Sequence, residues 1–186
     1  IILKKCYQHF GITFIDLFRT TQLNNNKLNQ FTEFSKTDIQ KLKENPGGII
    51  VTGHIGNWEL FLSLFGLNHI PFHVVAQLQR NKGAQNYFKE MREQHNCKII
   101  LKGASSKKLM AIIINNEYLG LACDQNAGEK GVIVPFFEKD ASIPKGAAIF
   151  QLKTNCPIFL CYCIADIDYN YFMFQLQNLK GCCDTL

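Results

Sequence analysis

The chain has 186 residues, of which 47% are hydrophobic and 12% aromatic, enough apolar material to bury one sizeable core without disulfides or metals. Charged residues make up only 19%, and this balance excludes a largely disordered chain, a collagen-like repeat and a coiled coil. The formal net charge of +5 is mildly basic and does not by itself indicate a partner. We therefore expect one globular domain over residues 1–186.

The first predicted elements are two helices. Apolar residues spaced three and four apart over residues 3–18 predict an amphipathic helix, whose apolar stripe faces either the core or a membrane surface. A second, shorter helix is expected to start near Thr37 or Asp38 and to end before Pro46, because the residue before a proline avoids helical geometry.

Strand and helix patterns then alternate along the chain. The β-rich runs are residues 49–52, 72–76, 98–101, 118–123, 132–137 and 157–164, and a run at 169–176 is compatible with a further, antiparallel strand. The helical patterns between them are residues 57–67, 84–95, 105–116 and 147–153. This alternation predicts an α/β fold with a largely parallel central sheet flanked by helices. In such sheets, reactive groups collect in the loops at the carboxyl ends of strands.

The sequence gives little support for a metal site, a membrane-spanning segment or nucleic-acid binding. The eight cysteines contain no CxxC and no matching histidine pair, so we expect reduced thiols, mostly in the core, and neither a metal nor a cofactor. No apolar run reaches the roughly 18 residues that a membrane span needs. Residues 80–108 carry eight basic and two acidic side chains, which form either a solvated helix face or an anion-binding surface. Few aromatic residues are interleaved there, so nucleic acid is not an expected partner.

The most informative loop follows the first predicted sheet strand and reads Thr-Gly-His-Ile-Gly-Asn-Trp-Glu over residues 52–59. Gly53 and Gly56 permit a tight turn that places the His54 imidazole at the edge of the sheet. Glu59 lies five residues later, where its carboxylate can hold one ring nitrogen and leave the other as a general base. No serine or cysteine stands beside them, so the base would act on a hydroxyl or on water. The alternative is that His54 caps the helix and Glu59 is an ordinary first-turn acid.

A second motif follows the run at residues 118–123. It begins Asp124-Gln125-Asn126 and continues with Gly-Val-Ile-Val-Pro-Phe-Phe at 131–137 and Pro-Lys-Gly-Ala at 144–147. Together with the His54 loop, these blocks resemble the bacterial lipid A biosynthesis acyltransferases, the lauroyl and myristoyl transferases of the wider HX4D/E glycerolipid acyltransferase superfamily, over about residues 2–165. The resemblance implies a glycerolipid-acyltransferase-like fold and a metal-free, cofactor-free acyltransferase.

The expected reaction, by this resemblance, moves a fatty acyl chain from an acyl carrier protein thioester to a hydroxyl of a lipid A precursor, in lipopolysaccharide biosynthesis. The expected location is the cytoplasmic face of the bacterial inner membrane. His54 is then the general base and Glu59 its orienting carboxylate. Arg92 and Asp124 occupy the positions of two further family residues and are expected to bind substrate. Arg92 would hold an anionic group or the thioester oxyanion, while Asp124 would order that arginine, complete the site or only cap a turn.

The sequence departs from the family pattern at Gln77, where many relatives have an arginine. Arg80 and Lys82 are the possible substitutes, and the identity of the acceptor stays open. The chain also begins near the family's first soluble helix and ends before its C-terminal region. The resemblance therefore implies a fragment without the N-terminal membrane anchor.

Other functions remain open at this stage. One is an acyltransferase for another lipid or glycolipid acceptor, although the FPEGTR-like signature of glycerol-phosphate enzymes is not found in the sequence. Another is a non-catalytic module that binds a lipid or a carrier protein through the basic segment and the first helix. A third is hydrolysis of the thioester by water.

Overall fold

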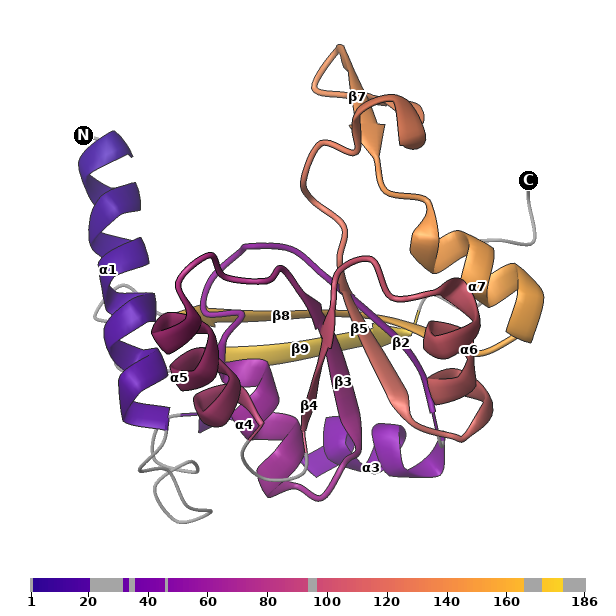
Figure 1. Ribbon diagram of the computed structural model, residues 1–186, viewed down its shortest axis with the longest axis horizontal. Coiled ribbons are helices and arrows are strands. Elements are labelled where there is room, and N and C mark those ends of the chain that lie inside the picture. Colours follow the sequence, from indigo (N-terminus) through magenta and orange to yellow (C-terminus); the bar gives the residue numbers. More distant parts are fainter. Residues whose placement is uncertain are drawn as a thin grey trace.

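The computed structural model describes residues 2–20, 32–33, 36–45, 47–93, 97–165 and 172–178. Over these residues the centre of the molecule is a seven-stranded sheet in the order β1-β9-β8-β2-β5-β3-β4 (Figure 1). Five neighbouring strands are parallel: β8 (Ile158–Ala165), β2 (Gly48–Thr52), β5 (Tyr118–Ala122), β3 (Phe72–Ala76) and β4 (Lys98–Leu101). Beyond β8, β9 (Phe172–Asn178) runs antiparallel and pairs in turn with β1 (Thr32–Glu33). The predicted α/β fold with a largely parallel sheet is confirmed.

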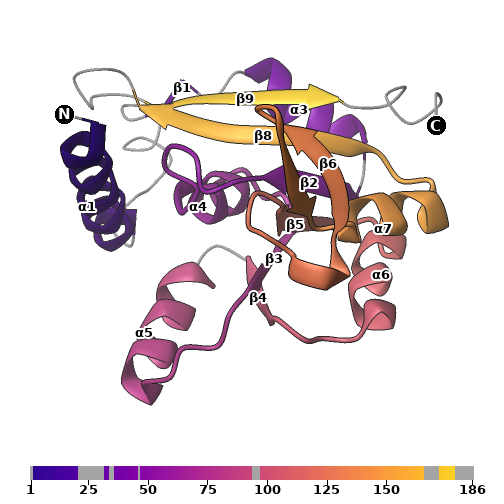
Figure 2. The same ribbon diagram turned by 90° about the horizontal axis from the view of Figure 1, so that it is seen from above.

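Helices cover both faces of this sheet. The helices are α1 (Ile2–Thr20), α3 (Lys36–Glu44), α4 (Leu60–Leu67), α5 (Lys82–Arg92), α6 (Ser106–Ile114) and α7 (Gly146–Thr154). Seen from above, α1 and α4 lie on one side of the sheet and α6 and α7 on the other (Figure 2). None of the helices in the described part of the chain is both long and apolar enough to cross a membrane.

The core has two parts because the central strands are buried on both faces. Ile50 packs with α3 and α4 in one cluster, whereas its neighbour Ile49 packs with α6 and α7 in the other. Both side chains are fully buried, as expected when successive residues of a strand point to opposite faces. Continuous apolar runs such as Gly48–Thr52 are therefore typical of the inner strands of a parallel sheet, and this is why the sequence predicted them well.

One predicted strand does not join the central sheet. β6 (Val132–Phe136) pairs antiparallel with β7 (Lys139–Ile143), which the sequence did not predict, and the resulting hairpin projects away from the sheet (Figure 1). Only a single 3-10 turn, Gly128–Lys130, stands between β5 and β6, and this is too short for the crossover that a parallel pairing requires. Phe137 and Glu138 both have positive φ at the two-residue hairpin turn.

The remaining boundaries agree with the predictions to within a few residues, with one difference that matters for the site. The helix predicted from residue 57 begins at Leu60, because residues 57–59 form a turn before it. The predicted end of α5 at residue 95 and the start of the last strand at residue 169 lie outside the described residues.

Candidate active site

The loop that carries His54 is fixed to two strands of the sheet. Gly56 has a φ of +62°, and a Cβ placed there would lie 1.7 Å from the carbonyl oxygen of Cys163 in β8. Only glycine allows this close approach. The next residue, Asn57, donates its backbone N–H to the same carbonyl at 2.7 Å. These contacts hold His54 at the carboxyl end of β2.

Asp124 is the carboxylate that contacts His54. It follows β5, the neighbour of β2, and the Cys123 N–H donates to the Thr52 carbonyl at 2.9 Å, which holds the two strand ends together. Asp124 Oδ2 accepts the His54 backbone N–H at 2.7 Å, and Oδ1 lies 3.0 Å from His54 Nδ1.

The charge of Asp124 decides which ring nitrogen carries the proton. Partial burial acts to raise the pKa of Asp124, but the hydrogen bonds from His54 outweigh it and hold that pKa below its usual range. Because an ionised carboxylate only accepts hydrogen bonds, the neutral His54 ring would carry its proton on Nδ1 and keep the lone pair on Nε2. The imidazole is 39% exposed, so Nε2 can reach a bound hydroxyl or water.

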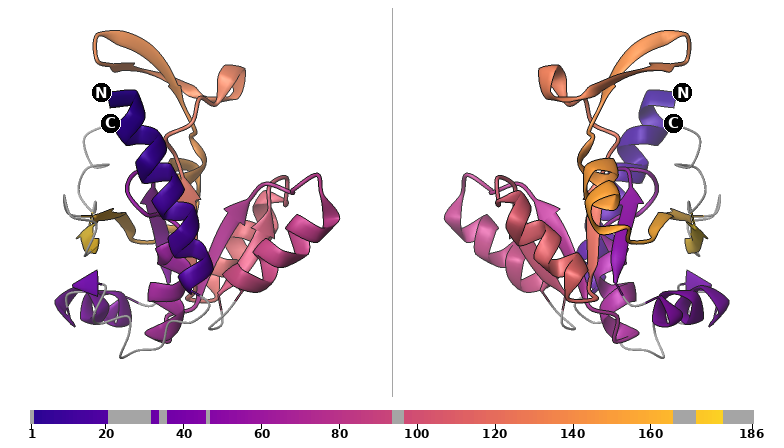
Figure 3. Two further views of the ribbon diagram at one scale, coloured as in Figure 1. Left: turned by 90° about the vertical axis from the view of Figure 1, so that its left-hand side faces the viewer. Right: turned by 90° about the vertical axis from the view of Figure 1, so that its right-hand side faces the viewer.

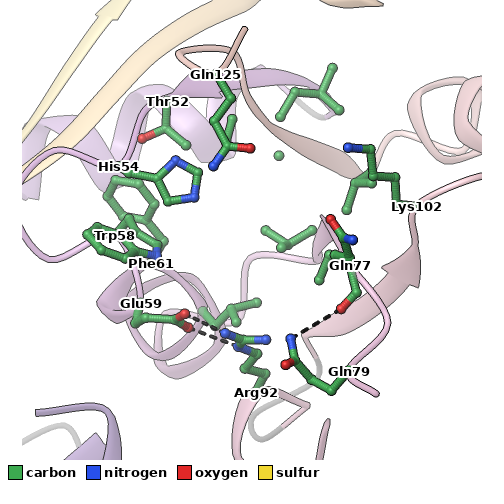
Figure 4. Close-up of a pocket in the computed structure, with 17 residues that line it drawn as sticks. Thr52, His54, Trp58, Glu59, Phe61, Gln77, Gln79, Arg92, Lys102 and Gln125 are labelled. Atoms are coloured by element: carbon green, nitrogen blue, oxygen red, sulfur yellow. Dashed lines mark hydrogen bonds and ion pairs between the residues drawn. The ribbon is translucent and has the colours of Figure 1, made fainter. Parts of the chain in front are cut away.

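Glu59 does not contact His54, which corrects the pairing expected from the sequence. Its carboxylate instead accepts two hydrogen bonds from Arg92 of α5, from Nε at 2.9 Å and from Nη2 at 2.5 Å (Figure 4). The expectation assumed a helix that starts at residue 57, whereas the turn before α4 directs Glu59 toward α5. The fork geometry and the partial burial of both side chains make this a well-ordered pair. Arg92 also lies over the Phe88 ring, 5.3 Å from its centroid.

A pocket of about 350 Å³ brings His54, Glu59 and Arg92 together (Figure 4). The Trp58 ring and the imidazole pack in a T-shaped arrangement, with the ring centroids 5.0 Å apart. The rest of the lining combines apolar and polar side chains: Thr52, Phe61, Leu62, Val74, Val75, Ala76, Gln77, Gln79, Lys102, Leu121, Ala122 and Gln125, with Gly120. Asp124 does not line the pocket, although it contacts the imidazole at Nδ1. The pocket combines an imidazole, a guanidinium and an apolar wall.

Lys102 is a pocket residue that the sequence reasoning did not single out. It lines the pocket together with Gln77, the position where an arginine was expected, whereas Arg80 and Lys82 do not line it. Lys102 directly follows β4, so the rule that reactive groups collect at strand ends would have found it.

The first helix also supports the His54 loop. Asn57 is only 1% exposed, and its Nδ2 donates to Oδ2 of Asp16 in α1 at 3.2 Å. Burial raises the pKa of Asp16, although Arg19 and Asn57 act in the opposite direction. Part of the predicted apolar stripe of α1 therefore faces the protein, since Phe10 lies 6.2 Å from Trp58 between ring centroids.

Within the described part of the chain, no three histidine, cysteine or acidic side chains are grouped so that they could hold a metal ion. Six described cysteines are free thiols, and three of them, Cys97, Cys161 and Cys163, are buried in the core. Burial raises the pKa of the Cys97 thiol to about 12, which leaves it unreactive at neutral pH.

The fold and the site together define a class: an α/β protein in which a carboxylate holds a histidine at the carboxyl edge of a parallel sheet, next to a pocket that an ion-paired arginine lines. The model of the bacterial lipid A biosynthesis acyltransferases matches residues 1–182, and the chain belongs to this family. The resemblance predicted from the two motifs is thus confirmed, and with it an acyltransferase family of lipid A biosynthesis. A comparison with curated proteins gave no match.

Proposed function

We propose that the protein transfers a fatty acyl chain from an acyl carrier protein thioester to a hydroxyl of a lipid A precursor, with His54 as the general base. One observation carries this proposal. Asp124 holds Nδ1 of His54 at 3.0 Å while the same ring lines a pocket with Arg92. This is the arrangement that general-base catalysis on a hydroxyl requires, because the proton-accepting nitrogen is fixed in both tautomer and position.

The proposed step begins when Nε2 of His54 takes the proton of the acceptor hydroxyl. The hydroxyl oxygen attacks the thioester carbonyl and forms a tetrahedral oxyanion. When the intermediate collapses, the carbon–sulfur bond breaks, the ester forms, and the thiolate of the carrier leaves with the proton held by the imidazolium. The Asp124 carboxylate stabilises that imidazolium. Glu59 compensates the charge of Arg92, whose guanidinium still offers N–H donors, and Lys102 adds a positive charge to the pocket, which favours the oxyanion and anionic groups of the substrates.

The apolar side of the pocket supports an acyl substrate. Phe61 and Leu62 of α4, Val74 of β3 and Leu121 of β5 all line the pocket. These side chains would contact the first carbons of the acyl chain next to the thioester, where burial of each methylene contributes about 0.8 kcal/mol. Glu59 has no direct role in this step. We propose that it positions Arg92.

Two exposed apolar projections support the proposal that the protein acts at a membrane surface. Leu3 and Tyr7 near the start of α1 are each 70% exposed, and Ile133 and Phe137 of the β6–β7 hairpin are 62% and 85% exposed. The start of α1 and the hairpin project in the same direction from the sheet (Figure 3). Exposed apolar residues of this kind are typical of a surface that binds lipid. We propose that they rest on the cytoplasmic face of the bacterial inner membrane, where the acceptor lies.

The test is an acyl-transfer assay with purified protein, acyl carrier protein thioester and a lipid A precursor, with products measured by mass spectrometry. The His54→Ala variant should lose at least about 99% of the transfer rate, since general bases contribute roughly 10²–10⁴-fold. His69→Asn is the matched control, because His69 is exposed just after α4 and asparagine tolerates its positive φ. Unchanged transfer in His54→Ala would refute the proposal. Release of free fatty acid that does not depend on the acceptor would show hydrolysis instead.

A further inference from the structure

A second groove opens beside the catalytic pocket, at the edge of the sheet. It lies among α5, β4 and the loop that leads into α6, with a volume of about 520 Å³. Three lysines line it, Lys89, Lys102 and Lys108, against a single acidic residue, Glu93. We call this surface the lysine groove.

The positive charge of the lysine groove is only partly neutralised within the protein. Glu93 pairs with Lys89 at 3.7 Å and also accepts the backbone N–H of Ile99 at 3.3 Å. Among the described residues, no carboxylate pairs with Lys102 or Lys108, and both side chains are exposed. Two positive charges therefore face the solvent across the groove and are available to an anionic partner.

The position of the lysines in α6 does not favour the stability of the helix. Ser105 caps α6 and accepts the backbone N–H of Lys108 at 3.3 Å, so Lys107 and Lys108 lie in the first turn, which contains no acidic residue. Positive side chains are unfavourable at this end because the helix dipole is already positive there. Because these lysines do not stabilise the helix, we explain their position by the binding of an anionic partner.

Lys102 connects the lysine groove to the catalytic pocket. It lines both of them, and its backbone N–H donates to the Ala76 carbonyl at 2.8 Å, which fixes the loop against the end of β3. Across the pocket from Lys102 lies His54 (Figure 4). A flexible arm anchored in the lysine groove could pass Lys102 and bring a thioester to the imidazole.

We infer that the lysine groove docks the acidic carrier protein that delivers the acyl thioester, with Lys102 at the opening through which its phosphate-bearing pantetheine arm reaches His54. This inference rests on the proposed function. Charge complementarity selects the occupant, because an acidic protein surface next to a phosphodiester matches unpaired lysines. The elements that line the groove, α5, β4 and the start of α6, lie to one side of the start of α1 and of the hairpin (Figure 3), so a water-soluble partner could approach while those projections contact lipid.

The first test measures binding without catalysis. The carrier protein bearing a free pantetheine thiol is titrated onto the wild-type protein and onto Lys108→Glu by calorimetry. We expect about tenfold weaker binding for Lys108→Glu, and a smaller dependence on salt concentration. Lys43→Glu is the matched control, since Lys43 is exposed on α3, at the opposite end of the sheet (Figure 1). Equal affinities for the wild-type protein and Lys108→Glu, or equal losses in both variants, would overturn the inference.

The second test distinguishes an effect on the binding of the carrier protein from an effect on the acyl-transfer step. For Lys108→Glu we expect the KM for the acylated carrier protein to rise about tenfold with little change in kcat, while transfer from acyl-pantetheine, which lacks the protein, stays unchanged. If Lys108→Glu instead weakened binding to anionic vesicles and left the KM for the carrier unchanged, the groove would be a lipid site and the inference wrong. If binding depended on Lys108 but no acyl transfer occurred with the wild-type protein, the proposed function would fail and the docking site would stand.

Discussion

Replacement of Asp124 by asparagine tests which carboxylate supports the His54 base. The substitution keeps the size of the side chain but removes its charge. In the transition state the imidazole becomes a cation 3.0 Å from Asp124 Oδ1, an attraction of about 5.5 kcal/mol at an effective dielectric constant of about 20. Both side chains are more than a third exposed, at 39% and 34%, so solvent screens part of this and about 3–4 kcal/mol remains. Each 1.4 kcal/mol is a factor of ten, which predicts a fall in kcat of about 10²–10³-fold.

The asparagine also presents an amide donor to Nδ1, which favours the tautomer with the proton on Nε2 and blocks the base. The assay is single-turnover transfer from the acylated carrier protein, with circular dichroism to show that the variant is folded. Glu59→Gln is the comparison, because Glu59 contacts Arg92 and not His54, and its kcat should fall by less than about tenfold. A nearly normal Asp124→Asn together with a Glu59→Gln that loses a hundredfold would show that our assignment of the two carboxylates is wrong.

Three further predictions concern stability. Gly56→Ala should lower the free energy of unfolding by at least about 2 kcal/mol, since its Cβ would displace the Cys163 carbonyl, and a thermal melt equal to that of the wild type would contradict the close approach. Tyr118→Phe should cost about 1–3 kcal/mol in urea denaturation, because the hydroxyl donates to the carbonyls of Leu42 and Asn45, the first of these bonds being buried, and no change would argue against these bonds. Because the folded pKa of Asp124 lies below its unfolded value of about 4, its contribution to stability is complete above that unfolded value and is lost as the pH falls through the lower folded pKa. The stability difference between wild type and Asp124→Asn should therefore shrink over this range, and a constant difference would count against the ionised pair.

The inner strands and their order along the chain could be predicted because each is a short apolar run that the fold buries on both faces. β7 could not be predicted for the opposite reason. Its sequence, Lys-Asp-Ala-Ser-Ile, has no apolar alternation, and the strand is stabilised by pairing with β6 in an exposed hairpin rather than by the core. β7 thus leaves no signal that a burial pattern can detect.

The structure brings the four residues singled out in the sequence close together, but the pairing of the two carboxylates differs from the one expected. Glu59 is near His54 in the chain, and its spacing indicated a contact within one helical turn. Asp124 is 70 residues away, and it reaches His54 only because β5 lies next to β2 with Gly48 opposite Tyr118. Neighbouring strands cannot be identified from the residues of either strand alone, so a sequence reading favours the nearer acid.

The attachment of the His54 loop to β8 has a consequence for how the protein is made. Gly56 and Asn57 depend on Cys163, which a ribosome adds more than one hundred residues later. Until that strand emerges and docks, the loop lacks the carbonyl that positions it. In the nascent chain, His54 is therefore present but not yet held in its final position. Acyl-transfer competence should therefore arise late in synthesis, together with the last parallel strand of the sheet.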